Sequence, residues 1–212
     1  MMSHIILTRR DKEIVENVKG LISDILIAVY QPFWFAILLA VIFMFAYKQN
    51  KGVWESLKQW LIWFRKEKKF RKVFYLVFYS VLVLFRTLFE RTLFENPLSN
   101  VLGEWSFYEK ENDKIVFNAH VPENIIMLAP FILLLFWAYR DRIFKNDVTL
   151  LKVVGYSFVI GFLVSFTIES LQLLLHLGTW QLSDLFYNTV GGIMGGLIYY
   201  VCFKVKHIIK KQ

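Results

Sequence analysis

The stretch FTIESLQLLLHLGTWQLSDLFYNTVGG, residues 166–192, decides the fold, because it joins two apolar runs by a short turn and places a carboxylate in or beside each run. Glu169 lies inside the first run, Val153 to Leu175, and Asp184 directly precedes the second, Leu185 to Phe203. A charge without a partner is costly to bury in protein and more costly in lipid. The two acids therefore indicate a polar site where two membrane helices meet.

The composition is that of a membrane protein. Of the 212 residues, 57% are apolar and 18% are aromatic, whereas soluble domains are about 45–50% apolar. The length allows one compact helical unit. The single cysteine, Cys202, forms no internal disulfide, and its apolar surroundings favour a small buried residue over a redox group. We therefore predict an all-α fold, a polytopic membrane helix bundle.

Five runs are candidates for membrane spans, which need about 20 mostly apolar residues. Pro32 and Pro130 should each kink or weaken a turn of the helix that contains them. The last four runs form a predicted four-helix core, and the first is an extra N-terminal membrane helix. The runs are Ile25–Tyr47, Val73–Phe89, Asn124–Tyr139, Val153–Leu175 and Leu185–Phe203.

Basic residues predict the orientation of these spans. Nine bases lie in residues 48–72, and further clusters lie in 140–152 and 204–211, whereas residues 90–123 hold seven acids against three bases. This alternation predicts a multi-pass protein of the cytoplasmic membrane with its C-terminus cytoplasmic and its N-terminus external. A re-entrant first helix followed by four true spans is the alternative. The net charge of +8 is thus an orientation signal, and we expect no nucleic-acid partner.

Residues 53–64, VWESLKQWLIWF, form an amphipathic segment before the core. Trp54, Leu57, Trp60 or Leu61, and Phe64 share one face at helical spacing. Two interpretations fit: an interfacial helix on the anionic inner leaflet, or a connector packed against the bundle. We assign residues 1–72 to an N-terminal membrane helix and amphipathic linker, and residues 73–212 to the four-helix membrane domain.

The polar residues of separate spans are predicted to lie at one height. A helix rises 1.5 Å per residue, so Glu169 lies roughly 24 Å up a hydrocarbon core that is about 30 Å thick. The same counting places the other polar residues in the outer half of the membrane. The predicted layer consists of Arg86, Asn124, Glu169, Gln172, Asp184 and Asn188, with His176 on the same helix face as Glu169.

Small residues predict how the last two spans pack. They recur on one stripe of each span, where they let helices approach closely, and we expect the two stripes to face each other. The predicted packing residues are Ser157, Gly161 and Ser165 on the fourth span, and Gly191, Gly192, Gly195 and Gly196 on the fifth.

Each polar residue also has a structural interpretation. Arg86 either reaches the outer headgroups or pairs with Glu169. Gln172 and Asn188 can serve as interhelical hydrogen-bonding groups, and Asp184 suits a helix N-terminus with Ser183 as its cap. One histidine, His176, has no second metal ligand at close spacing, so we predict no metal site and no cofactor.

These motifs resemble the VanZ family. The pattern E-x-x-Q at Glu169, a short turn, and D-x-x-x-N-x-x-G-G from Asp184 resemble its last two core helices. RTLFERTLFENPLSN resembles the outer end of its first core helix, whose arginine matches Arg91, and ENIIMLAPFILLLFW resembles the second, with Asn124 and Pro130. The resemblance covers about residues 73–203. Where many members have an arginine and an acid after the turn glycine, this chain has Thr179 and Gln181.

The resemblance implies a role in resistance to glycopeptide antibiotics of the teicoplanin type. We therefore expect a bacterial membrane protein that acts at the outer face on a cell-envelope component, such as a lipid-anchored precursor, or on a lipoglycopeptide antibiotic, in contact with membrane lipids. The sequence leaves two alternatives open: an intramembrane enzyme that uses Glu169 for acid–base chemistry on a lipid-linked substrate, and a proton-coupled small transporter. It does not predict the oligomeric state.

Overall fold

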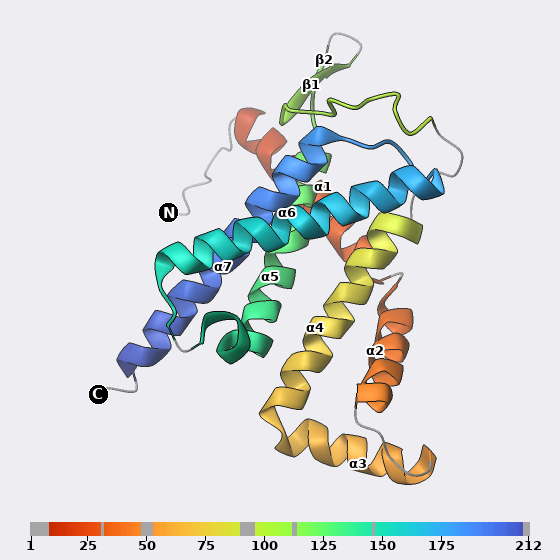
Figure 1. The fold of residues 1–212 in the computed structure, drawn as a ribbon. Helices are drawn as coiled ribbons and strands as arrows, with labels where there is room; N and C mark the ends of the chain where they lie inside the picture. Colours follow the sequence, from red (N-terminus) through yellow and green to blue (C-terminus); the bar gives the residue numbers. More distant parts are fainter. Residues whose placement is uncertain are drawn as a thin grey trace, which may run out of the picture.

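The computed structural model describes residues 9–30, 32–47, 53–89, 96–111, 114–145 and 147–209. Helices dominate this part of the chain, and one two-stranded antiparallel hairpin, β1 (Tyr108–Glu111) with β2 (Lys114–Phe117), accompanies them. Figure 1 shows the hairpin at one end of the helical bundle and helix α3 at the other. Arg91, the predicted match to the family arginine, lies outside the described residues.

In the part of the chain that the structure describes, four helices are long and apolar enough to cross a membrane, so the predicted helical membrane fold is confirmed. Each contains one of the last four predicted runs and extends beyond it at one or both ends. The helices are Lys68–Phe89, made of α4 (Lys68–Leu84) and the π-helical η1 (Phe85–Phe89), α5 (His120–Phe144), α6 (Leu150–Leu175) and α7 (Leu182–Ile209).

The first predicted span is divided at Pro32. Helix α1 (Arg9–Tyr30) ends before this proline and α2 (Phe33–Tyr47) begins after it, as expected for a residue that fits only the first turn of a helix. With 15 residues, α2 is about 22 Å long, which is shorter than the hydrocarbon core of about 30 Å. The other proline, Pro130, lies inside α5 and does not divide it. The non-helical backbone angles of α5 are found at Tyr139, nine residues later.

Helix α3 (Val53–Lys66) is the predicted amphipathic helix, and part of its aromatic face packs against α4. The Trp60 ring contacts the rings of Phe70 and Phe74, and Phe64 also contacts Phe74. Leu61 and Ile62 are exposed. Trp60 and Phe64 therefore pack on the bundle, as the connector interpretation predicts. Leu61 and Ile62 instead form an exposed apolar strip.

Helix α7 lies between α5 and α6, and its glycines form two rows rather than one. Gly192 and Gly196 lie against Gly161 and Ser157 of α6, as the sequence predicted for the facing stripes. The other row, Gly191 and Gly195, contacts the backbone of α5 instead. The predicted single glycine face is thus incomplete, because adjacent residues of a helix point about 100° apart and serve two different neighbours.

A loop and the hairpin cover one end of the bundle. Residues 96–107 lie over the turn between α6 and α7, and the backbone N–H groups of Trp180 and Leu182 donate to the carbonyls of Pro97 and Val101 at 2.8 and 2.9 Å. Neither feature could be predicted from the sequence, since these contacts are made by backbone atoms and carry no side-chain pattern. They tie the turn that carries Gln181 to the preceding loop.

Candidate functional site

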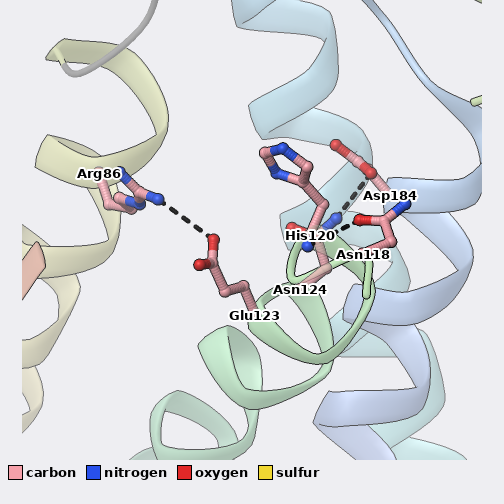
Figure 2. A network of polar contacts seen from close by, with 6 residues as sticks. All are labelled: Arg86, Asn118, His120, Glu123, Asn124 and Asp184. Atoms are coloured by element: carbon pink, nitrogen blue, oxygen red, sulfur yellow. Dashed lines mark hydrogen bonds and ion pairs between the residues drawn. The ribbon is translucent and has the colours of Figure 1, made fainter. Parts of the chain in front are cut away.

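Asp184 lies at the start of α7, under the loop. Its side chain is nearly buried, with the residue 8% exposed, and Oδ1 accepts a hydrogen bond of 2.6 Å from Nδ2 of Asn124, in the first turns of α5. Figure 2 shows the two side chains facing each other across the interface between α5 and α7. The first turn of a helix also stabilises a negative charge through the helix dipole. The carboxylate is therefore fixed by two helices.

Glu169, near the end of α6, is buried to 1% exposure. Its Oε2 accepts a hydrogen bond of 3.1 Å from the backbone N–H of Gln181. The Gln181 side chain donates in turn to the Thr179 hydroxyl at 2.8 Å. The two residues that depart from the family pattern thus bind each other, and Glu169 holds the turn between α6 and α7 in place.

The two predicted amides lie deeper and link helices. Gln172 Nε2 donates to the backbone carbonyl of Thr87 in η1 at 2.7 Å, and Asn188 Nδ2 donates to Ser165 Oγ at 3.1 Å. Both amides are 1% exposed. Asn188 therefore connects α7 to α6, and Gln172 connects α6 to the end of the first long helix. These contacts agree with the interhelical role that the sequence allowed for both.

Arg86 forms an ion pair that neither sequence interpretation predicted. Its Nη2 lies 3.1 Å from Oε2 of Glu123, in the first turn of α5, and the two side chains are 41% and 19% exposed. Figure 2 shows Arg86 extending from its helix toward Glu123 across the gap between the two ribbons. Glu123 precedes the predicted start of its span at Asn124, so it was not among the predicted site residues. The π-helical turn at Phe85–Phe89 also changes the direction of Arg86 relative to a regular α-helix.

The loop reaches the site through Ser183, which was the predicted cap of α7. Helix α7 begins one residue earlier, at Leu182, and Ser183 Oγ instead accepts a hydrogen bond of 3.0 Å from the backbone N–H of Glu104. Gly103 approaches so closely, with φ of +72°, that a Cβ there would lie 2.0 Å from Ser183 Oγ. The prediction of Ser183 as a cap was therefore wrong, because the loop uses this hydroxyl.

A second polar pair lies between the loop and α5. Asn118 Nδ2 donates to the Glu104 carboxylate, and Asn118 Oδ1 accepts from the backbone N–H of His120 at 3.0 Å. Asn118 thus links the loop to the first N–H groups of α5 (Figure 2). Neither residue was a sequence candidate, because an asparagine and a glutamate in an acidic loop are ordinary exposed residues.

His176 lies apart from these groups. It is the left-handed C-cap of α6, with φ of 52°, and it is exposed. The backbone N–H of Leu177 donates to the carbonyl of Gln172 at 2.9 Å, which is the bonding of a Schellman ending. The predicted placement of His176 on the same helix face as Glu169 therefore does not hold, because α6 ends at Leu175. Among the residues that the structure describes, no group of three or more His, Cys, Asp and Glu side chains could hold a metal ion.

The arrangement offers hydrogen-bond acceptors at fixed positions. Carboxylates on α5, α6, α7 and the loop are gathered at one end of the bundle, and neutral N–H donors hold at least three of them. Such groups suit recognition of hydroxyl, amide or amine groups on a ligand. These contacts join Glu104 to Asn118, Glu169 to Gln181, Asp184 to Asn124, and Glu123 to Arg86.

Four apolar helices joined at one end by a layer of buried carboxylates and amides define a polytopic membrane protein. The model of the VanZ/LLP1 family matches residues 25–203, most of the chain. The chain therefore belongs to the VanZ/LLP1 family, which confirms the resemblance. The match includes residues 25–72 as well as the predicted core, while the domain boundary after residue 72 stays a prediction. No curated protein and no solved structure matches the chain.

Proposed function

We propose that this chain is a VanZ-type protein of the bacterial cytoplasmic membrane that acts at the outer face, on a cell-envelope component or on a lipoglycopeptide antibiotic of the teicoplanin type. The observation that carries the proposal is the pair of held carboxylates, Asp184 and Glu169. Both are almost fully buried, and both lie at the end of the bundle that the loop covers. Buried acids in membrane helices are functional by default.

The distribution of cations supports the outer position of this site. Lys68 and Lys69 begin α4, Arg142 lies in the last turn of α5, and Lys206 lies in the last turn of α7. These helix ends lie opposite the end that carries Asp184. Since bases near span ends favour the cytoplasmic side, the carboxylate end belongs to the outside.

The covering loop supports a ligand with an apolar part. Large apolar side chains of the loop and of the first turns of α7 are exposed although hydrogen bonds hold the backbone around them. Tyr187 Oη, for example, donates to the carbonyl of Trp105 at 3.0 Å. Exposed tryptophan and tyrosine are typical of membrane–water interfaces. A lipid-linked group could thus reach the carboxylates from the membrane surface. The exposed side chains are Leu98, Leu102, Trp105, Phe107, Tyr108, Leu182 and Phe186.

The test compares variants that remove one charge each. Asp184→Asn and Glu169→Gln keep the size of the side chain and can still accept the observed hydrogen bonds. The control is Asp147→Asn, which removes an exposed acid at the opposite end of the bundle. We expect the first two variants to lose protection against teicoplanin in a susceptible bacterial host, at equal amounts in the membrane. Wild-type protection by both variants would refute the proposal.

The orientation has an independent test. Cys202 is exposed, so the prediction that it is buried was wrong. It is therefore first replaced by serine, and single cysteines are then introduced as Ser106→Cys and Lys145→Cys. A maleimide that does not cross membranes should label position 106 in intact cells and position 145 only after lysis. The reverse pattern would place the carboxylates in the cytoplasmic leaflet and contradict action at the outer face.

A further inference from the structure

A second charged cluster lies at the other end of the bundle, away from the carboxylates. Its cations come from three helices: Lys68 and Lys72 from the start of α4, Arg140 from the end of α5, and Lys206 from the end of α7. Lys72 lies against Trp137, and Arg140, three residues further along α5, lies over the ring of Phe203 on α7. Lys206 follows Phe203 by three residues on α7, and Asp141 is the acid that pairs with Arg140. Four cations against one acid leave a net charge of +3.

The packing holds the cations near one another. Lys72 Nζ donates to the backbone carbonyl of Trp137 at 2.9 Å and lies 5.2 Å from the centre of the Trp137 ring. The Arg140 guanidinium lies 5.8 Å from the ring of Phe203, on α7. These contacts fix Lys72 against α5 and Arg140 against α7. Like charges held together repel, and Asp141, which is paired with Arg140 and largely exposed, offsets only part of this repulsion.

A buried hydroxyl lies one helical turn before Phe203. Tyr199 is 6% exposed, and its ring contacts the rings of Phe136 and Phe144. Its ring centre is 6.3 Å from that of Phe203, over which the Arg140 guanidinium lies, and the Tyr199 hydroxyl has no hydrogen-bond partner among the described residues. A buried hydroxyl normally has a partner. An acceptor bound beside Arg140 would supply it.

We propose that Lys72, Arg140 and Lys206, with the Tyr199 hydroxyl, form a binding site for the phosphodiester headgroup of an anionic phospholipid. The phosphate oxygens accept from the cations and the hydroxyl, while the acyl chains lie along the apolar surfaces of α4 and α7. Basic clusters between membrane helices bind such headgroups. The site is separate from the carboxylates, so this proposal does not depend on the proposed function.

The experiment measures lipid binding by the purified full-length protein. Phosphatidylglycerol or phosphatidylcholine is added to the protein in a neutral detergent, and bound lipids are counted by native mass spectrometry. The cluster variant carries Lys72→Gln, Arg140→Gln and Lys206→Gln. The control variant carries Lys58→Gln, Lys66→Gln and Lys204→Gln, which removes the same charge from exposed positions outside the cluster. Tyr199→Phe tests the hydroxyl alone, because it keeps the aromatic ring in place.

We expect wild-type protein and the control variant to bind one phosphatidylglycerol molecule tightly and phosphatidylcholine weakly. Each lost cation should weaken binding about fivefold, so the cluster variant should bind roughly 100-fold more weakly. Tyr199→Phe should weaken binding by about fivefold. Equal binding by the cluster and control variants, or equal binding of both lipids, would overturn the proposal. Displacement of phosphatidylglycerol by 10 mM inorganic phosphate would also overturn it, because it would identify a free-phosphate site.

If the cluster variant does not fold, lipid binding by two further variants tests the proposed site. Lys72→Arg with Lys206→Arg keeps the charge and should keep wild-type binding, whereas Tyr199→Phe should still lower it. Loss of binding in the arginine variant, or an unchanged affinity of Tyr199→Phe, would overturn the proposed chemistry.

Discussion

Two adjacent glycines of α7 should differ strongly in how much the same substitution destabilises the protein. A Cβ at Gly191 would lie 1.9 Å from the carbonyl oxygen and 2.8 Å from the carbonyl carbon of Ile125, on α5. A Cβ at Gly192 would lie 3.4 Å from the Cα of Gly161 and 3.4 Å from Cγ1 of Ile132. The first position has no room for a methyl group, and the second is close to ordinary van der Waals contact. Gly191→Ala and Gly192→Ala are therefore a matched pair.

The magnitude follows from which atoms must move. At Gly191 the obstacle is backbone, so α5 and α7 must separate by roughly 1.5 Å to restore contact at about 3.5 Å. Overpacking of a core costs about 1–3 kcal/mol. Because the obstacle is rigid, we expect Gly191→Ala to lower the free energy of unfolding by about 3 kcal/mol. At Gly192 the small adjustment is opposed by the better helix propensity of alanine, about 1 kcal/mol. Gly192→Ala should therefore change the free energy of unfolding by less than about 1 kcal/mol.

The assay is equilibrium unfolding of the purified protein in mixed micelles with increasing sodium dodecyl sulfate, followed by circular dichroism and tryptophan fluorescence. Both substitutions add the same methyl group, one residue apart, so detergent effects cancel in the comparison. We expect the unfolding midpoint of Gly191→Ala to fall clearly below that of Gly192→Ala. Equal midpoints, or a lower midpoint for Gly192→Ala, would refute the assignment of the two glycine rows to α5 and α6.

Three further substitutions test single contacts. Asn124→Ala removes the donor to Asp184 and should cost about 1–3 kcal/mol of unfolding free energy, because a nearly buried carboxylate loses a hydrogen bond; an unchanged midpoint in the same assay would contradict this. Gln172→Leu leaves the Thr87 carbonyl without its donor and should speed hydrogen exchange in residues 85–89 by roughly tenfold, a loss of about 1.4 kcal/mol; unchanged exchange would show that the bond does not hold η1. Ser183→Ala should make residues 96–107 more sensitive to limited proteolysis with little loss of helix stability, whereas equal cleavage rates would show that the hydroxyl does not hold the loop.

The helical core could be predicted because its signals are local. Apolar runs of membrane length, the bases between them and the carboxylates in the last hairpin lie along the chain in the order of the helices. The family resemblance could be recognised for the same reason, since Glu169, Gln172, Asp184 and Asn188 all lie within one hairpin. The rise per residue also placed Asn124 and Asp184 at the same height, and the structure joins them by a hydrogen bond.

Contacts that depend on rotation about a helix axis could not be predicted in this way. Arg86 was placed at the correct end of the bundle, but its partner depends on the direction of its side chain, which the π-helical turn changes. Gly191 and Gly195 were assigned to the wrong neighbour because a sequence pattern gives the spacing of a row and not the helix that it faces. The loop over Ser183 left no pattern, because backbone atoms make most of its contacts.

Helix α7 connects the two ends of the bundle. It has 28 residues, so it is about 42 Å long, which is longer than the hydrocarbon core of about 30 Å. Asp184 lies at its positive end and Lys206 at its negative end, as the helix dipole favours. The contact of Gly191 with Ile125 lies next to Asn124, the donor to Asp184. Close packing of α7 on α5 therefore sets the length of that hydrogen bond, and the glycine row holds the carboxylate in position as well as the helices together.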